Sequence, residues 1–554
     1  MSKWICNQVV CVLLISWLCH SLAKPVHASE NETARPESFY DELIQMASNA
    51  RNDVQFQALR KRVRQLQQQP YTPPETIPSE FTSLSYDAYR QIQFRQENAI
   101  WRADENPFWI EAFHPGFVHQ NKVRLNIIEH GLSKEIPFST SYFDYGETTP
   151  PTHSHSKNGF AGVKLVGRFP QADTYQEMLT FLGASYFRAH TAETVYGVSN
   201  RALAINVGLN QPEEFPAFRE FWIAKPHPRD TSITAFALLE SPSCVGAYQF
   251  VLHPQQGHVD VDVKCELNFR SKPEKVGLAP ITSMWMWGDG QKPPALETRP
   301  HCHDSDGLLI QDGEQWTWRP LTRLSYPSIS RFAVKDLKGF GLSQRNLNFE
   351  DYNDTGALYH RRPSVWITPQ NKWPAGSMEL FEIAAVHEGI DNIGAYWVPE
   401  ESLDYRKPLK LNYRIRWSHG EQRFPSHQKL AFLKKTSLQR SPGGDLVKAF
   451  LQFQMPKSET NATLTQWQPQ VQIIRGTLLE AQWTPLKKRQ EQNLHSSETP
   501  ECQLEILVAP ESQDPIEIHC SLERNGKTQS ENCRLLISPT APEYRYPQVY
   551  LRQE

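Results

Sequence analysis

The segment Val259-Asp260-Val261-Asp262-Val263 alternates apolar and acidic side chains at every position. Because successive side chains of a β-strand point to opposite faces, this period of two predicts a strand with one face in a core. Short runs of similar character recur between turn residues at 122–128, 202–208, 246–252, 265–270, 364–368, 378–384, 392–398, 411–417, 469–475, 503–508 and 515–521. So many short strands without alternating helices predict a mainly β protein of antiparallel sheets and sandwiches, and not a parallel α/β fold.

Two segments break this pattern and are expected to be helical. Within 37–69, Phe39, Leu43 and Met46 recur at helical spacing, and Pro70 ends the run. A second, short helix is expected at 173–182, which is rich in good helix formers.

The N-terminus has the pattern of a cleavable secretion signal over residues 1–28. Lys3 is followed by an apolar run from 9 to 18 and by Val26-His27-Ala28, a small-x-small cleavage pattern. The apolar run is too short to span a bilayer, which disfavours the alternative of a membrane anchor. The absence of an Arg-Arg pair in this signal favours the general secretory route over the twin-arginine route. No later stretch is apolar for long enough to predict a transmembrane segment in the mature chain.

Composition excludes one class of partner and suggests another. The formal net charge of −3 gives no basic footprint, so we expect no nucleic acid partner. The 15 Trp include candidates for stacking on sugars, although most of them are expected in the core. Three of the nine Cys lie in the signal. Cys244 and Cys265 flank a hairpin tip near Pro254-Gln255, so a symmetric hairpin would allow a bridge between them, with the register left open.

A change of pattern near 399–409 predicts two domains. Proline and charged residues interrupt the strands there, and the alternating strand 411–417 follows. We therefore expect a large β-sandwich over residues 29–400. An immunoglobulin-like sandwich is expected over residues 405–554.

The densest polar cluster is His301-Cys302-His303-Asp304-Ser305-Asp306-Gly307. Its residue types suit a metal, but alternation on an extended segment would split them between two faces, so we expect neither metal nor cofactor. The remaining alternatives are a catalytic carboxylate at Asp304 or Asp306 and an ordinary polar turn, and the pattern alone favours the turn.

A second acidic cluster, 387–392, precedes the strand that begins at Ile393. Hydrolysis of a glycosidic bond needs two carboxyl groups, which two acid-bearing loops at strand edges could supply. Aromatic and arginine side chains between the clusters could bind sugars. Together with Asp306, the candidates for binding substrate are Arg345, Tyr359, Arg362, Trp366 and Trp373.

At these clusters the chain resembles the osmoregulated periplasmic glucan biosynthesis proteins of the G/D type. The matching stretches include Phe113-His114-Pro115-Gly116, Phe181-Leu182-Gly183-Ala184-Ser185-Tyr186-Phe187-Arg188-Ala189, His303-Asp304-Ser305-Asp306-Gly307, Lys338-Gly339-Phe340-Gly341, Asn371-Lys372-Trp373 and Asp391-Asn392. The missing twin-arginine signal makes the chain most similar to the G branch.

The resemblance implies a galactose-mutarotase-like β-sandwich followed by an immunoglobulin-like domain, in a periplasmic protein that acts on a β-1,2-glucan. Some members of the family are inverting endo-β-1,2-glucanases, which implies Asp304 as general base, with Asp306 as its alternative, and Asp391 as general acid. One departure is 387–392, where relatives often carry Gly-Glu-Thr-x-Asp-Asn. The alternative function is a non-catalytic glucan-binding factor that assists the inner-membrane glucosyltransferase, and a mutarotase function has only fold analogy in its favour.

Overall fold

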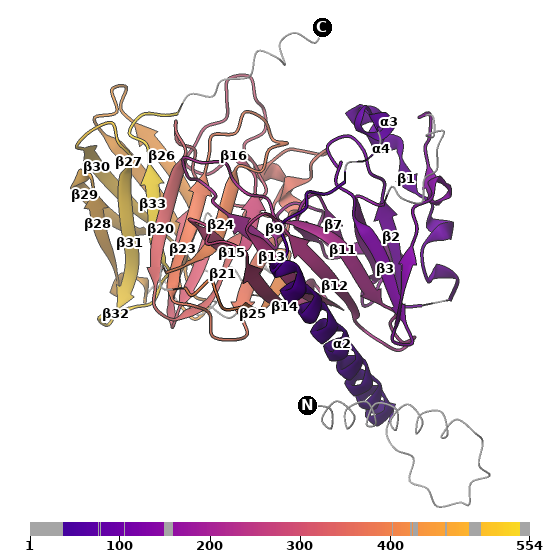
Figure 1. Ribbon diagram of the computed structural model, residues 1–554. Helices are drawn as coiled ribbons and strands as arrows, with labels where there is room; N and C mark the ends of the chain where they lie inside the picture. The colour runs from indigo at the N-terminus through magenta and orange to yellow at the C-terminus, as the bar shows by residue number, and fades with distance from the viewer. Residues whose placement is uncertain are drawn as a thin grey trace, which may run out of the picture.

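Figure 1 shows the computed structural model of the protein. The structure describes residues 37–542 except 76, 78, 105, 149–158, 401–402, 422–423, 425–429, 460–462 and 487–499. The predicted signal of residues 1–28 lies outside this part of the chain. The described chain is mainly β, which confirms the predicted class.

Two extended sheets form the larger part of the molecule, which we call the first lobe. Within the described residues, the smaller of the two has ten strands. In spatial order these are β2 (Phe108–Phe113), β6 (Gly162–Arg168), β7 (Tyr175–Leu182), β8 (Tyr186–Ala189), β9 (Ser199–Arg201), β15 (Val276–Ser283), β24 (Ile393–Pro399), β23 (Gly376–Glu382) and β20 (Ser328–Val334), with β10 (Leu203–Ile205) paired to β15.

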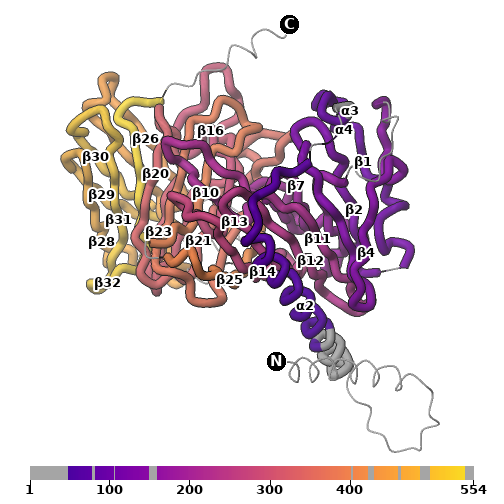
Figure 2. Tube along the Cα trace, in the orientation of Figure 1, coloured from indigo at the N-terminus to yellow at the C-terminus, as the bar shows by residue number. Residues whose placement is uncertain are grey.

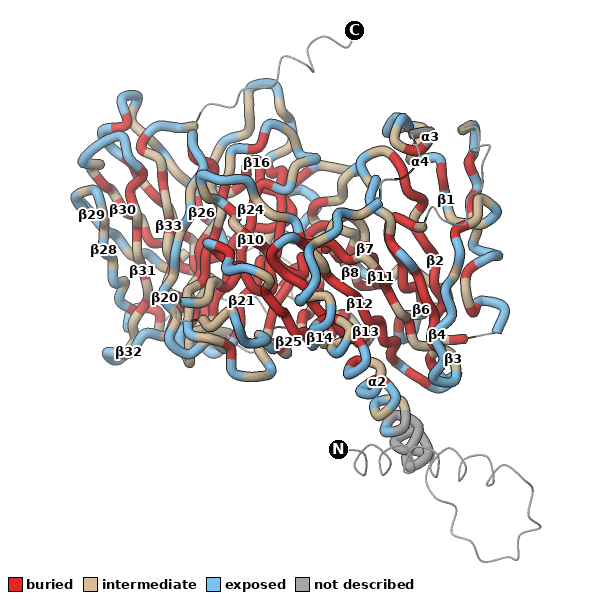
Figure 3. Tube along the Cα trace, in the orientation of Figure 1, coloured by how far each residue is buried: buried red, intermediate tan, exposed pale blue. Residues whose placement is uncertain are grey.

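The larger sheet runs through both halves of the molecule. Its first-lobe strands are, in spatial order, β4 (Leu132–Ile136), β3 (Arg124–Glu129), β11 (Ala217–Ala224), β12 (Ile233–Glu240), β13 (Cys244–Gln255), β14 (His258–Phe269), β25 (Leu409–Ser418), β22 (Ser364–Pro369), β21 (Leu337–Ser343), β18 (Gly307–Asp312) and β19 (Gln315–Pro320). The valines of the 259–263 segment all point into the core, as predicted, and are fully buried. This core lies between the two sheets and holds more than half of the buried hydrophobic residues. Figure 3 colours the buried residues red along the Cα trace.

The second lobe follows β25. Three further strands continue the larger sheet, β33 (Asn532–Ile537), β31 (Ile516–Arg524) and β28 (Trp467–Ile474), and β32 (Lys527–Thr528) pairs with β31. A four-stranded sheet shares a second core with them, in the order β26 (Phe432–Arg440), β27 (Val447–Gln454), β30 (Glu501–Pro510) and β29 (Gly476–Pro485). The lobes join where β33 pairs in parallel with β19, at Thr317 with Asn532 and at Trp318 with Cys533.

The structure changes the role of the strand that was expected to open the C-terminal domain. β25 pairs along its whole length with β14 and with β22, so it is an interior strand of the first lobe. Its apolar residues Leu411, Tyr413, Ile415 and Trp417 belong to the first core. The second core draws its later residues from Phe424 onward and also contains Leu309, Trp316, Trp318 and Trp366 of the first lobe. By packing, β25 therefore belongs to the first lobe.

The long helix α2 (Glu37–Gln67) confirms the first helix prediction. Its C-terminal half lies across β12, β13 and β14, as Figure 2 shows. Phe56, Leu59 and Val63 pack on the outer face of the larger sheet. Arg64 Nε also donates to Glu266 Oε1 of β14 at 2.9 Å, which fixes the helix over that strand. Among the described residues, no helix combines the length and the apolar composition that a bilayer span requires.

Short elements connect these parts. They are α3 (Ser79–Thr82), α4 (Tyr86–Gln91), the strand pairs β1 (Gln93–Phe94) with β5 (Phe143–Asp144) and β16 (Trp285–Trp287) with β17 (Cys302–His303), and the 3₁₀ turns η1 (Gln96–Asn98), η2 (Arg102–Asp104), η3 (Thr140–Tyr142), η4 (Phe349–Asp351), η5 (Tyr359–Arg361) and η6 (Leu464–Gln466).

Two local predictions are wrong. Residues 175–182 of the predicted second helix form β7, because pairing with β6 and β8 overrides the helical propensity of the segment. The Cys244–Cys265 bridge is absent, since the hairpin turns at 256–257 and its register pairs Cys244 with Phe269 and Cys265 with Tyr248. The predicted tip was about two residues early, and a shift of the tip separates cysteines that a symmetric hairpin would pair.

Candidate functional site

Asp304 occupies a buried position at the edge of the first lobe. It directly follows β17, and its backbone N–H donates to the Met284 carbonyl at 2.8 Å. Its side chain is only 10% exposed, and its Oδ1 forms an ion pair with Arg362 Nε at 3.2 Å. Burial raises the pKa of Asp304 to about 6, with Arg362 opposing the rise and the negative charge of Asp391 adding to it. Asp391 is therefore close enough to be felt electrostatically.

Asp391 lies at the end of the loop that precedes β24. Its Oδ2 accepts a hydrogen bond from Thr282 Oγ1 of β15 at 3.1 Å and lies 3.7 Å from Arg188 Nη2 of β8. The side chain is 29% exposed, so it is open to solvent where Asp304 is closed. Three strands of the smaller sheet thus position this carboxylate.

Asn392 fixes the backbone next to Asp391. Its amide donates to the carbonyls of Trp285 at 2.9 Å and Ile383 at 2.7 Å, and its Oδ1 accepts the Trp285 N–H at 2.8 Å. These bonds use both the NH₂ donor and the carbonyl acceptor of the Asn392 side chain. They join the β24 loop to β16 and therefore to the β17 segment that carries Asp304.

Glu388 anchors the other end of the same loop. Its Oε2 accepts hydrogen bonds from Arg299 Nη1 at 2.7 Å, from the Tyr359 hydroxyl at 3.0 Å and from the Cys302 thiol at 3.3 Å. Tyr359 begins η5 directly after Leu358, whose φ of 52° lies in the left-handed region that bulky residues rarely adopt. Such local strain persists where surrounding contacts hold it, and here they hold the loop that ends in Asp391.

We define the acid site as Asp304, Asp391, Arg188 and Arg362. It contains two carboxyl groups in different environments, one buried with a raised pKa and one partly exposed, each with its own arginine. Two carboxyl groups of different character are what acid–base chemistry at a glycosidic bond requires. Arginines beside them also provide planar donors for hydroxyl oxygens.

The structure separates the two candidate aspartates of the 301–307 cluster, although strict strand alternation would put residues 304 and 306 on one face, because both lie in the connection between β17 and β18. Asp304 faces Arg362, whereas Asp306 accepts the backbone N–H groups of Arg345 at 2.6 Å and Asn346 at 2.9 Å. The Asn346 amide also donates to Asp306 at 2.8 Å. This carboxylate therefore holds the turn after β21, and the structure does not bring it into the acid site.

Arg345 is likewise placed between the lobes and not at the acid site. Its guanidinium donates to Glu421 at 2.8 Å and to Glu531 at 3.0 Å, and it lies 3.5 Å from the centre of the Trp318 ring. Its side chain is buried, so no group is left to meet a sugar. The expectation that Arg345 binds substrate therefore has no geometric support.

The two tryptophans proposed for sugar stacking lie in the cores. Trp366 is buried between Trp316 and Phe424 in the second core. Trp373 is buried against Phe340 and Tyr413 in the first. Neither ring presents a face to solvent, because both fill space at the inner faces of the sheets.

The structure therefore brings four of the predicted residues together. Asp304 pairs with Arg362, whose guanidinium lies over the ring of Tyr359, and Asp391 lies within electrostatic range of Asp304. Sequence reasoning missed Arg188, Thr282 and Arg299. Arg188 lies in the 181–189 stretch that carries the family resemblance, which was the one available signal for it. Among the described residues, no three His, Cys, Asp or Glu side chains converge as a metal would need.

Fold and site define a two-lobed, mainly β protein with two unlike carboxyl groups in the segments that follow β17 and precede β24. The family model described as "Periplasmic glucan biosynthesis protein, MdoG" matches residues 54–535. The chain belongs to this family and takes part in periplasmic glucan biosynthesis.

Curated relatives agree with the family model. A "Glucans biosynthesis protein G" from Serratia proteamaculans is 37% identical over 83% of this chain and 88% of its own length. One from Ralstonia nicotianae is 41% identical over 66% and 72%, and one from Dickeya dadantii is 38% identical over 67% and 73%. Among solved structures, an alpha-galactosidase from Geobacillus stearothermophilus covers 47% of this chain and 40% of its own, at 7% identity and a TM-score of 0.24, which supports no argument.

Proposed function

We propose that the protein is an inverting endo-β-1,2-glucanase that trims the periplasmic glucan. The observation that carries this proposal is the pairing of a buried Asp304 with a partly exposed Asp391, each beside an arginine. Asp391 would protonate the oxygen of the leaving sugar while the glycosidic bond breaks. Water would attack the anomeric carbon from the opposite face, and its proton would pass to Asp304.

The pKa of Asp304 supports its role as the base. A carboxyl group whose pKa is about 6 is mostly ionised at neutral pH and accepts a proton more readily than an ordinary aspartate. Before substrate binds, however, the raised pKa also favours Asp304 as the member of the pair that holds a proton. The reverse assignment, with Asp304 as acid, is therefore the alternative within this mechanism.

The test is incubation of the purified protein with linear β-1,2-glucan, followed by measurement of new reducing ends. Natural protein should release short glucans, and Asp391→Asn should release them at least about a hundredfold more slowly while its circular dichroism and thermal transition stay unchanged. Asp262→Asn is the matched control, because Asp262 is also paired with an arginine, Arg414 at 2.7 Å, but lies on β14. Unchanged activity in Asp391→Asn would overturn the assignment.

The second candidate function is a non-catalytic glucan-binding factor that assists the inner-membrane glucosyltransferase. It is favoured by the ion pairs of both carboxylates, since a paired carboxylate is a good acceptor for sugar hydroxyls. This function predicts measurable binding of linear β-1,2-glucan by titration calorimetry with no new reducing ends over hours.

Export by a cleaved signal of residues 1–28 belongs to the same proposal, as does the division into a glucan-acting domain and an immunoglobulin-like domain. N-terminal sequencing of the protein recovered from the periplasm should begin at Ser29. A mature chain that still carries residues 1–28 would exclude cleavage there.

A further inference from the structure

Cys520 and Cys533 lie directly opposite each other in the second lobe. The antiparallel register of β31 and β33 pairs Cys520 with Cys533, between the pairs His519–Arg534 on one side and the end of the ladder on the other. Both are free thiols in this structure, as Cys244 and Cys265 are, and both side chains are buried in the same core. Side chains of directly opposed residues point to the same face of a sheet, so the two thiols face each other.

The spacing of opposed residues suits a disulfide. Cα atoms of directly opposite residues in an antiparallel pair are about 4.5 or 5.5 Å apart, depending on the hydrogen-bonding site. Disulfides span about 4.4–6.8 Å between Cα atoms, so either site falls within range without movement of the backbone. Burial raises the pKa of the Cys533 thiol, and direct contact with the Cys520 thiol raises it further.

The chain provides a contrasting pair. Cys244 and Cys265 are also buried on neighbouring antiparallel strands, but Cys265 is opposite Tyr248, four residues from Cys244 along β13. Two residues advance a strand by nearly 7 Å, so four place these thiols out of reach of each other. Both pairs of cysteines are therefore buried on adjacent strands. They differ in register, which places only Cys520 and Cys533 opposite each other.

We propose that Cys520 and Cys533 form a disulfide in the mature protein. The family's periplasmic setting supplies the required conditions, because disulfides form and persist in that compartment. Two thiols lose two protons and two electrons as the S–S bond forms. A protein or small-molecule disulfide accepts them and is reduced to two thiols.

The burial of both thiols places this reaction during folding. Thiolates are the reacting species, and a buried thiol with a raised pKa yields few of them. Oxidation therefore precedes closure of the second core. Once the core has closed, the bond is shielded from reductants.

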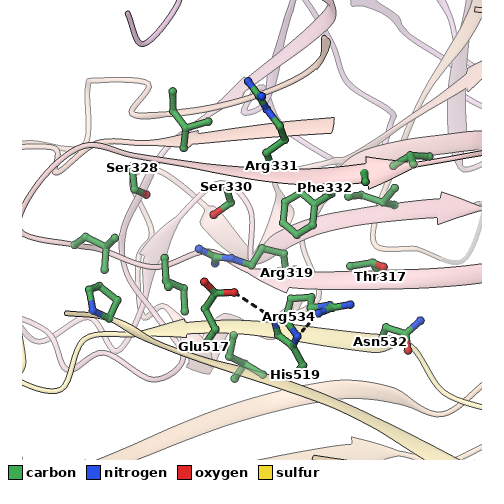
Figure 4. Close-up of a pocket in the computed structure, with 18 of the residues that line it drawn as sticks. Thr317, Arg319, Ser328, Ser330, Arg331, Phe332, Glu517, His519, Asn532 and Arg534 are labelled. Carbon is green, nitrogen blue, oxygen red and sulfur yellow. Dashed lines mark hydrogen bonds and ion pairs between the residues drawn. The ribbon is translucent and has the colours of Figure 1, made fainter. Parts of the chain in front are cut away.

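The bond would brace the junction of the lobes. Cys533 also pairs with Trp318 of β19 in the parallel contact that joins the lobes. The neighbours of the cysteines, His519, Asn532 and Arg534, point to the opposite face and line a groove of about 720 Å³ between β20 and the β31–β33 pair, shown in Figure 4. A cross-link at this position would fix the register of both strands beneath that groove.

The test uses protein recovered from the periplasm. Denatured protein is alkylated with iodoacetamide before reduction and cut with a protease specific for glutamate, which separates Cys502, Cys520 and Cys533 onto peptides 502–505, 518–523 and 532–543. We expect peptides 518–523 and 532–543 to be linked and the remaining four thiols to carry iodoacetamide. Alkylation of all six, or any other pairing, would overturn the proposal.

Cysteine variants test the same pairing and supply their own control. Cys520→Ala should expose Cys533 to alkylation. Cys502→Ala, the control in the same core, should leave the cross-link in place. Dithiothreitol present during unfolding should lower the Tm of the natural protein by several degrees and leave that of the Cys520→Ala/Cys533→Ala double variant unmoved. If that variant does not fold, the peptide assay on the natural protein alone still decides the matter.

Discussion

Arg362 Nε lies 3.2 Å from Asp304 Oδ1, and the same guanidinium lies over the ring of Tyr359, 5.3 Å from its centre. Tyr359 in turn donates to Glu388 at 3.0 Å. One arginine thus connects the buried carboxyl to the loop that ends in Asp391. The ion pair offsets only part of the desolvation of Asp304, whose pKa stays well above that of an ordinary aspartate.

This balance predicts how Asp304 affects stability. Because folding raises its pKa from 3.8 to about 6, the folded state binds the proton more tightly than the unfolded state. The resulting stabilisation is present below about pH 4 and is lost as the pH rises through 6. The difference in unfolding free energy between natural protein and Asp304→Asn should shift by about 2 kcal/mol from pH 4 to pH 7, measured by denaturant titration. A difference that does not vary with pH would show that Asp304 has an ordinary pKa.

The pH dependence of activity follows from the same group. If Asp304 is the base, kcat/KM for linear β-1,2-glucan should rise with pH with an apparent pKa near 6, because the ionised form is the active one. If Asp304 is the acid, kcat/KM should fall through the same range. Initial rates of reducing-end formation between pH 4.5 and 8 distinguish the two.

Leaving-group chemistry assigns the roles independently. A nitrophenyl leaving group departs without a proton, so loss of the acid costs little with a nitrophenyl β-1,2-glucoside, whereas loss of the base still costs the full effect. On linear glucan, Asp391→Asn and Asp304→Asn should each lose about 10²–10⁴-fold in kcat. On the nitrophenyl substrate, only the Asp391→Asn variant should regain activity close to that of the natural protein. If the Asp304→Asn variant regained activity instead, Asp304 would be the acid and Asp391 the base.

The outcome for individual residues shows what sequence patterns can predict. The 259–263 segment was placed correctly because a period of two depends only on local strand geometry. The sequence did not show that Trp366, Trp373 and Arg345 are buried, because burial depends on which strands lie beside them. Trp366 is covered by Phe424 of the second lobe, and Arg345 by Glu421 and Glu531, all remote in sequence. Asp304 and Asp391 were predicted through family motifs, and Thr282, which donates a hydrogen bond to Asp391, has no local signal at all.

Arg345 should matter for stability and not for substrate affinity. It is buried between Glu421 and Glu531, so Arg345→Met removes the guanidinium that pairs with two buried carboxylates. Removal of one partner from a buried ion pair typically costs about 3–5 kcal/mol. Arg406→Met is the control, since Arg406 is exposed and contacts only a neighbouring Asp404, and its effect should be near zero. A raised KM with unchanged stability in Arg345→Met would return Arg345 to the substrate site.

Asn392 should be needed both for stability and for activity, since its amide joins the Asp391 loop to β16. Asn392→Ala removes three hydrogen bonds and leaves the Trp285 N–H and the Trp285 and Ile383 carbonyls without that partner. An unsatisfied buried polar group costs about 1–3 kcal/mol, so we expect a loss of at least about 2 kcal/mol in urea unfolding. Because Asp391 directly precedes Asn392, kcat should fall further than the loss of folded protein explains, while the pKa of Asp304 stays unchanged.

The control is Asn371→Ala, which removes a comparable amide that bonds the backbone of residues 410 and 412 away from the acid site. It should lose stability without a selective loss of kcat, and equal loss of kcat in both variants would mean that Asn392 acts only through the fold.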